Sequence, residues 1–130
     1  MGLRDLFSKK ASDKLNKYFQ ELNISLNTND GMYSFEIYLN EAGYALYPYF
    51  TFNDDNALSF IVNVRRITND ENVLNSINEF NLKSKYLVAK SNLNSIYLEY
   101  NTICYVDNIK EVIKSILDNI YSLQIEIDKL

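Results

Sequence analysis

Apolar residues recur at helical spacing at both ends of the chain. Near the start one stripe contains Leu3, Phe7, Ala11, Leu15, Tyr18, Phe19 and Leu22. Near the end another contains Ile109, Val112, Ile113, Ile116, Leu117, Ile120, Leu123, Ile127 and Leu130. Spacing of three and four residues is typical of amphipathic helices, so we predict helices over 3–23 and 107–130. Ser12 offers an alternative start for the first helix, with residues 1–9 as an arm.

Between these helices, apolar and polar residues alternate with the period of β-strands. The alternation predicts strands over 33–39, 44–52 and 58–65, separated by turns rich in Asn, Asp and Gly. Pro48 interrupts the second strand and has no N–H to donate. We therefore expect this strand to lie at an edge or to be broken at Pro48.

A short helix is predicted between the two groups of strands. Its apolar stripe contains Val73, Leu74, Ile77 and Phe80. Thr68 and Glu71 have the spacing of a capping box, and Asn81 suits a helix end. An apolar run at 86–89 then predicts a strand, and a second strand is predicted at 95–100. Residues 102–106 either continue this second strand or form one more strand.

Together these elements predict an α+β fold within a single domain, residues 1–130. The order is α-β-β-β-α-β-β-α, with an antiparallel sheet of about five strands and helices packed on one face. The last helix would be about 30 Å long, whereas a strand of ordinary length covers about 20 Å. We therefore expect its end to overhang the sheet and form a homodimer through Leu123, Ile127 and Leu130. Alternatively, the first helix covers this stripe within one chain.

Composition limits the classes of function. The 130 residues are 47% hydrophobic and 23% charged, which is typical of globular proteins, and the net charge of -4 disfavours nucleic-acid binding. Residues 1–17 contain five basic and two acidic side chains, so the rest of the chain carries -7. The basic segment is either a solvated helix face or a weak contact for an acidic partner or a membrane surface. We find no export signal and no apolar run that could span a membrane, and expect a cytoplasmic protein.

The residues that usually carry catalysis are scarce. The chain has no His, and its three Gly are too scattered for a phosphate-binding loop. Cys104, the single cysteine, lies in a strand-like run and is expected to be a buried thiol. Asp54–Asp55 and Asp70–Glu71 are adjacent acidic pairs that fit solvated turns better than a metal site, and Arg65–Arg66 fits a salt bridge better than an anion site. We therefore expect no enzyme activity, no metal and no cofactor.

Tyrosines on one strand face are the candidate partner-binding residues. Tyr38, Tyr47 and Tyr49 alternate with the predicted core residues, and Ile61 does so on the third strand. Tyrosine is effective at interfaces because its ring buries area while its hydroxyl still hydrogen-bonds. It is also a good strand former, so these positions are equally explained by strand propensity.

The stretch 73–81 resembles the YbjN family of bacterial proteins. The matching feature is an apolar–Asn pair, Ile77-Asn78, followed three residues later by Asn81. The order of predicted elements extends the resemblance over nearly the whole chain. It implies the fold of type III secretion chaperones and a protein-binding role, with a secreted effector or a toxin as candidate partner. An alternative is an immunity or inhibitor protein, whose acidic surface would complement a basic toxin or nuclease.

Overall fold

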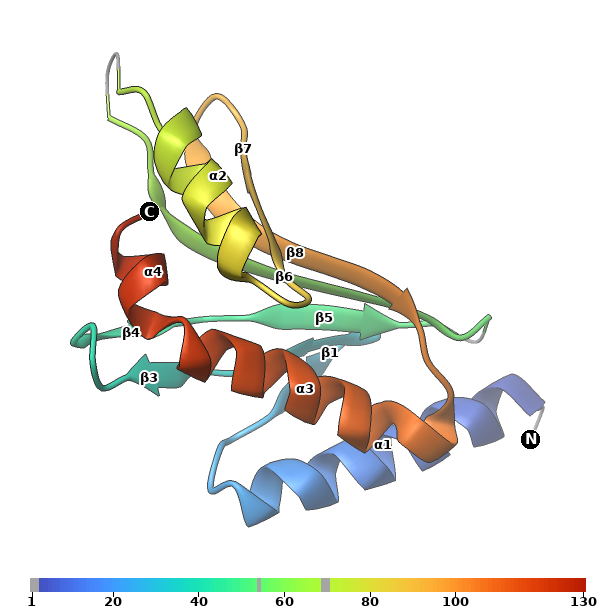
Figure 1. Cartoon of the computed structure of the whole chain (residues 1–130). Helices are drawn as coiled ribbons and strands as arrows, with labels where there is room; N and C mark the ends of the chain where they lie inside the picture. The colour runs from blue at the N-terminus through green and yellow to red at the C-terminus, as the bar shows by residue number, and fades with distance from the viewer. Residues whose placement is uncertain (1–2, 54, 69–70) are drawn as a thin grey trace.

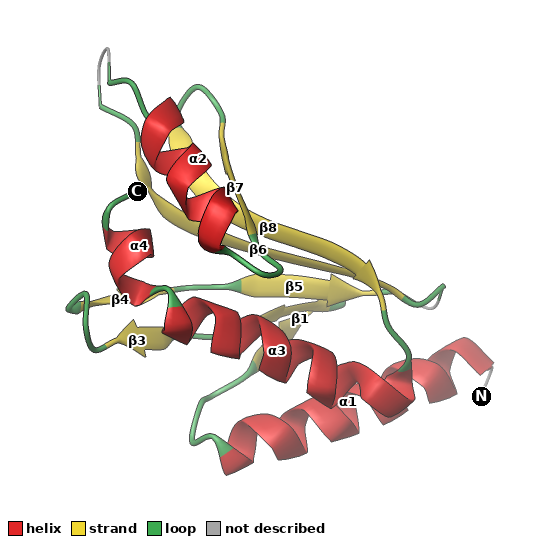
Figure 2. Cartoon of the chain, in the orientation of Figure 1, coloured by secondary structure: helices red, strands yellow, loops and turns green. Residues whose placement is uncertain are grey.

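The fold is a six-stranded antiparallel sheet, a two-stranded ribbon and a layer of helices (Figures 1 and 2). The computed structural model describes residues 3–53, 55–68 and 71–130, with side chains from residue 9 onward. Its elements are α1 (Leu3–Glu21), β1 (Asn27–Asn29), β2 (Met32–Ser34), β3 (Ile37–Leu39), β4 (Tyr44–Leu46), β5 (Tyr49–Phe52), β6 (Ala57–Arg66), α2 (Leu74–Lys83), β7 (Val88–Ser91), β8 (Ser95–Ile103), α3 (Ile109–Ser122) and α4 (Gln124–Asp128), with a 3-10 turn at Val106–Asn108 before α3. This is the α+β class predicted from the sequence, but the described residues form more strands than predicted, because the predicted strands 33–39 and 44–52 are each divided in two.

The extra strands come from the interruption of one long hairpin. The six-stranded sheet has the order β1-β2-β5-β6-β8-β7, and β3 pairs with β4 separately. Ser34 lies opposite Tyr49 and Ile37 opposite Leu46, so both pairings keep one register. The Phe35 N–H donates to the Pro48 carbonyl (3.2 Å), but proline cannot return a bond. Pro48 therefore breaks the strand, as one of the two sequence-based alternatives predicted.

One face of the sheet forms the core. Side chains alternate along β6, where Leu58, Phe60 and Val62 are buried while their neighbours are not. Phe35 and Phe50 pack on this face, with ring centroids 6.3 Å apart. Because successive side chains of a strand point to opposite faces, burial of one set assigns the other set to the second face.

The helices cover this buried face. From α1 come Ala11, Leu15, Tyr18 and Phe19, all buried; the side chains of Leu3 and Phe7 lie outside the described part, and Leu22 is exposed. α3 runs across the front of α1, and α2 lies over β7 and β8 (Figure 1). From α2, Ile77 and Phe80 are buried, as its apolar stripe predicted.

The predicted ends of α2 were wrong. Thr68 donates to the Glu71 carboxylate through its N–H (3.2 Å) and hydroxyl (3.0 Å), but these bonds lie in the loop before the helix. The helix begins only at Leu74, because Glu71 also binds Arg65 and stays with β6. Asn81 does not end the helix, which continues to Lys83 while the Asn81 amide bonds to strand β7.

The argument for a dimer through the last helix was also wrong. Leu123, Ile127 and Leu130 are only 9%, 0% and 2% exposed within one chain. The helix does not run straight: it breaks at Leu123, and α4 starts in a new direction. Gln124 anchors the break, since its Oε1 accepts the Glu41 N–H from the β3–β4 turn (2.9 Å). The stripe therefore packs onto its own chain, and no apolar overhang exists at these residues.

Candidate functional site

The second face of the sheet is covered by no described helix or loop. We call it the open face. It comprises the side chains opposite the core on β2 to β8: Met32, Ser34, Glu36, Tyr38, Ala45, Tyr47, Tyr49, Thr51, Ser59, Ile61, Asn63, Arg66, Val88, Lys90, Ser95, Tyr97, Glu99 and Asn101. Every one of them is exposed or half-buried, whereas the alternating positions between them are mostly buried. A large surface is thus left with nothing from the described chain packed on it.

The structure brings all four predicted partner-binding residues onto this face. Tyr49 lies opposite Ile61 on the neighbouring strand, and Ile61 lies opposite Glu99 on the next. Tyr38 and Tyr47 are 56% and 67% exposed, and they sit on the ribbon that continues β2 and β5. The four residues therefore form one continuous row rather than four scattered positions.

Sequence reasoning missed several apolar members of the open face, among them Tyr97 and Val88. Tyr97 alternates with the buried Ile96 and Leu98, so the pattern used for the other tyrosines could have found it. Val88 lies in an uninterrupted apolar run, which predicts a strand but not which side chain faces outward. Its placement required the register, which puts it opposite Glu99.

Hydrogen bonding separates these tyrosines from the core tyrosine Tyr33. The Tyr33 hydroxyl lies 2.6 Å from the Ser12 hydroxyl on α1. In the described part of the chain, no hydrogen bond engages the hydroxyls of Tyr38, Tyr47, Tyr49 or Tyr97. The charged pair Lys90 and Glu99, by contrast, is already joined at 3.5 Å. The open face therefore offers rings and free hydroxyls, while much of its charge is neutralised internally.

One edge of the sheet is closed by side-chain amides. Asn81 on α2 accepts the Ala89 N–H (2.7 Å) and donates to the Ala89 carbonyl (3.1 Å), as a neighbouring strand would. Asn119 on α3 accepts the N–H groups of Tyr86 (2.9 Å) and Leu87 (3.0 Å). Asn81 thus occupies the outward N–H and carbonyl of Ala89 in β7, and Asn119 occupies two N–H groups just before the strand; an exposed edge would offer such groups to another strand. At Ala89 the β7 edge is therefore closed to pairing with another strand.

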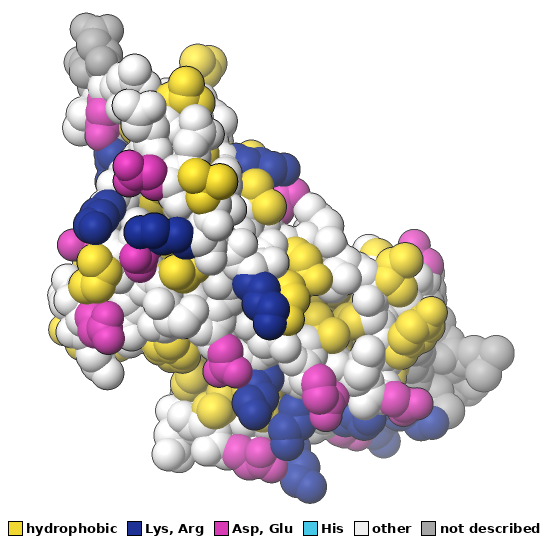
Figure 3. Space-filling view, in the orientation of Figure 1, with side chains coloured by type: hydrophobic (Ala, Val, Ile, Leu, Met, Phe, Trp, Pro, Cys, Tyr) yellow, Lys and Arg dark blue, Asp and Glu magenta, His cyan; other side chains and the backbone are white. Residues whose placement is uncertain are grey.

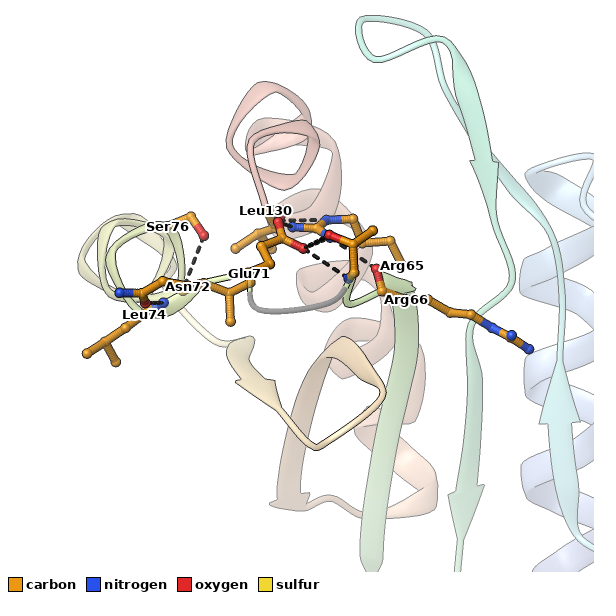
Figure 4. Close-up of polar contacts among 9 residues, drawn as sticks. Arg65, Arg66, Glu71, Asn72, Leu74, Ser76 and Leu130 are labelled. Atoms are coloured by element: carbon orange, nitrogen blue, oxygen red, sulfur yellow. Dashed lines mark hydrogen bonds and ion pairs between the residues drawn. The ribbon is translucent and has the colours of Figure 1, made fainter.

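A β-bulge sets the two arginines at the end of β6 on opposite faces. The pairing shifts between Asn63 and Arg65, so Arg65 lies opposite the buried Ile96 and Arg66 opposite Ser95. Simple alternation along β6 would place Arg65 on the same side as Ile61 and Asn63, and the bulge overturns this. Arg65 donates to the Glu71 carboxylate through its two terminal guanidinium nitrogens, Nη1 and Nη2, and to the Leu130 carbonyl through Nε (2.8 Å), while Arg66 extends away from them (Figure 4).

The Arg65–Glu71 contact is the salt bridge that the sequence favoured for this pair of arginines. Hydrogen bonds from Arg65 first, then from the Thr68 N–H and hydroxyl, lower the pKa of Glu71 to about 2. The Arg65 pKa is raised, chiefly by the same Glu71 bond. The cluster ties the end of β6 to the loop before α2 and to the last residues of the chain.

No catalytic arrangement appears among the residues that the structure describes. Burial raises the pKa of the Cys104 thiol to about 11, so it is not an activated nucleophile. No group of three or more His, Cys, Asp or Glu side chains lies close enough to hold a metal within the described ranges. Asp55 is exposed, while Asp54 and Asp70 lie outside the described residues.

The side of the molecule that carries the helices has a different character. Acidic and basic side chains are interspersed across it, and neither sign forms a patch of its own (Figure 3). Lys14 and Lys110, from α1 and α3, pair with Asp107 (3.7 Å) and Glu21 (3.5 Å). Only the first of these pairs neutralises a positive charge of the first helix, because Lys110 belongs to α3 and pairs with an acidic residue of α1.

None of the described helices is both long and apolar enough to cross a membrane.

Comparison with known proteins does not add to this picture. No protein-family model matches the chain, and no curated protein sequence matches it.

Proposed function

We propose that this protein is a non-enzymatic protein-binding module that receives its partner on the open face. The observation that carries the proposal is the one-sided covering of the sheet. Helices bury one face, and the other presents Tyr38, Tyr47, Tyr49 and Ile61 in one row. A contiguous exposed surface with aromatic anchors is typical of a protein interface.

The chemistry of the open face suits reversible binding to a protein. Its tyrosine rings supply rigid area with few torsions to order, and their unused hydroxyls can bond to a partner's backbone. Ser59 and Asn101 already bond to each other (2.7 Å), so part of the polar surface needs no new partner when it is covered. The tyrosine hydroxyls, by contrast, would need hydrogen-bond partners from the bound protein.

The resemblance to YbjN and to secretion chaperones is part of this proposal. Those folds imply the same division between a helical layer and a sheet surface. The immunity or inhibitor alternative would place the acidic excess on the binding surface. On the open face Glu36 and Glu99 are balanced by Arg66 and Lys90, so its charge does not favour a strongly basic toxin. We therefore prefer a chaperone-like module.

Paired tyrosine substitutions test the proposal. A tagged chain is expressed in the source cell, and co-purifying proteins are quantified for the wild type and two double variants. Tyr38→Ala with Tyr47→Ala removes two exposed rings from the open face. Tyr105→Ala with Tyr121→Ala removes two exposed tyrosines outside it. We expect at least one protein to be lost with the first variant and retained with the second; equal retention in both refutes a role for the open face.

A further inference from the structure

A polar groove borders the open face where β6 ends. Its volume is 710 Å³, within the range of ligand-binding sites. The lining comes from the end of β6 and from the β7–β8 turn, and includes Asn63, Arg65, Arg66, Ile67, Asn94 and Ser95. The backbone closes one end, where the Ile67 N–H donates to the Asn94 carbonyl (2.9 Å). No acidic side chain is among these lining residues.

The two arginines of the groove differ in how much charge they have to offer. Arg65 is neutralised by Glu71, which binds two of its guanidinium nitrogens. No described residue forms an ion pair with Arg66 or accepts a hydrogen bond from its guanidinium. The bulge in β6 is the cause, because it turns Arg65 toward Glu71 and leaves Arg66 on the other face (Figure 4). The groove thus holds one free positive charge.

Two amide side chains line the same groove. Asn63 and Asn94 line the groove, and neither side-chain amide has a hydrogen bond within the described part of the chain. Each amide nitrogen can donate two hydrogen bonds. An arginine fork and amide donors in one groove suit an oxyanion, since guanidinium binds such groups through two parallel bonds and the amides can donate further bonds.

We propose that this groove binds a carboxylate, supplied by an acidic side chain of the protein partner. The single free charge of Arg66 matches a monoanion, whereas a phosphate dianion would leave excess negative charge. Asn63 lies opposite Tyr97 and thus links the groove to the tyrosines of the open face. That the carboxylate belongs to a protein partner rests on the proposed function. The anion-binding site itself does not depend on it.

Titration of the purified protein tests the anion site directly. Acetate is the probe for a carboxylate, phosphate for a phosphoryl group and chloride the control, all at constant ionic strength. The Arg66 Nε–H and the Asn63 and Asn94 amide groups are followed by nitrogen-15 NMR. We expect saturable shifts at all three with acetate and weaker binding of phosphate. Stronger binding of phosphate than of acetate overturns the choice of carboxylate, and linear shifts no larger than those with chloride overturn the site.

Substitutions then assign the effect. Arg66→Gln removes the charge, and we expect it to weaken acetate binding about tenfold or more. Lys114→Gln replaces an exposed cation on α3, outside both the groove and the open face, and should leave the shifts unchanged. Unchanged binding in Arg66→Gln overturns the proposal. If acetate binds saturably but the Tyr38→Ala, Tyr47→Ala variant retains every co-purifying protein, the anion site is upheld. Only the protein-binding role of the open face is then refuted.

Discussion

Replacing Asn119 with alanine should destabilise the protein far more than its polar character suggests. Asn119 lies on α3 and is only 7% exposed. Its Oδ1 accepts hydrogen bonds from the Tyr86 N–H, the Leu87 N–H and the Ser84 hydroxyl (3.1 Å). A net hydrogen bond contributes about 1 kcal/mol, and a buried N–H left without a partner costs about 1–3 kcal/mol. The Leu87 bond is buried, so we expect Asn119→Ala to lower the free energy of unfolding by about 2–4 kcal/mol.

Urea denaturation measures this loss, and amide hydrogen exchange locates it. Exchange should accelerate at Tyr86 and Leu87, because their N–H groups lose their acceptor. Asn78→Ala is the matched control: Asn78 is exposed on α2, and we expect a change within about 0.5 kcal/mol. A loss below 0.5 kcal/mol for Asn119→Ala, with unchanged exchange at both amides, would show that Asn119 does not hold the segment before β7.

Two further predictions concern the β7 edge and the Arg65–Glu71 contact. Asn81→Ala removes two hydrogen bonds to β7, and we expect the free energy of unfolding to fall by about 1–2 kcal/mol and the variant to self-associate in sedimentation. Neither effect is expected for Asn78→Ala. A fully monomeric Asn81→Ala variant would contradict the claim that Asn81 prevents pairing at the β7 edge. Glu71 has a pKa lowered from 4.5 to about 2, so its contribution to stability is present at neutral pH and is lost as the pH falls through this interval. Glu71→Gln should therefore lower stability at pH 7 and flatten its decline between pH 4.5 and 2, whereas the exposed Glu79→Gln should do neither; parallel pH profiles for Glu71→Gln and the wild type would refute this.

The fold could be predicted where one local pattern dominates. The alternation over 33–39 and 44–52 predicted which side chains of these strands face the core, and a break at Pro48 was one of the two predicted alternatives. The faces of Tyr38 and Tyr47 followed from the same rule. These features depend on strand periodicity and on the missing proline N–H, and both are visible in the sequence.

The features that could not be predicted depend on distant contacts. The bulge exchanges the faces on which Arg65 and Arg66 lie. The residue types in β6 do not reveal it, because one extra residue in the strand leaves its amino-acid composition that of an ordinary strand. The break at Leu123 follows from Gln124 meeting the β3–β4 turn, 83 positions away in the sequence. Asn81 resembled a helix end, but its amide is used by β7. In each case a tertiary hydrogen bond or register overrode the local preference.

Site-specific photo-crosslinking in the source cell tests the role of the open face most directly. A photoreactive phenylalanine derivative is placed at Tyr47 on the open face or at Tyr121 on α3, both exposed tyrosines. Each ring is exchanged for another of similar size, so the fold should be preserved in both. The account predicts a discrete adduct with another protein from position 47 and none from position 121. Adducts from position 121 alone, or from neither position, would contradict it.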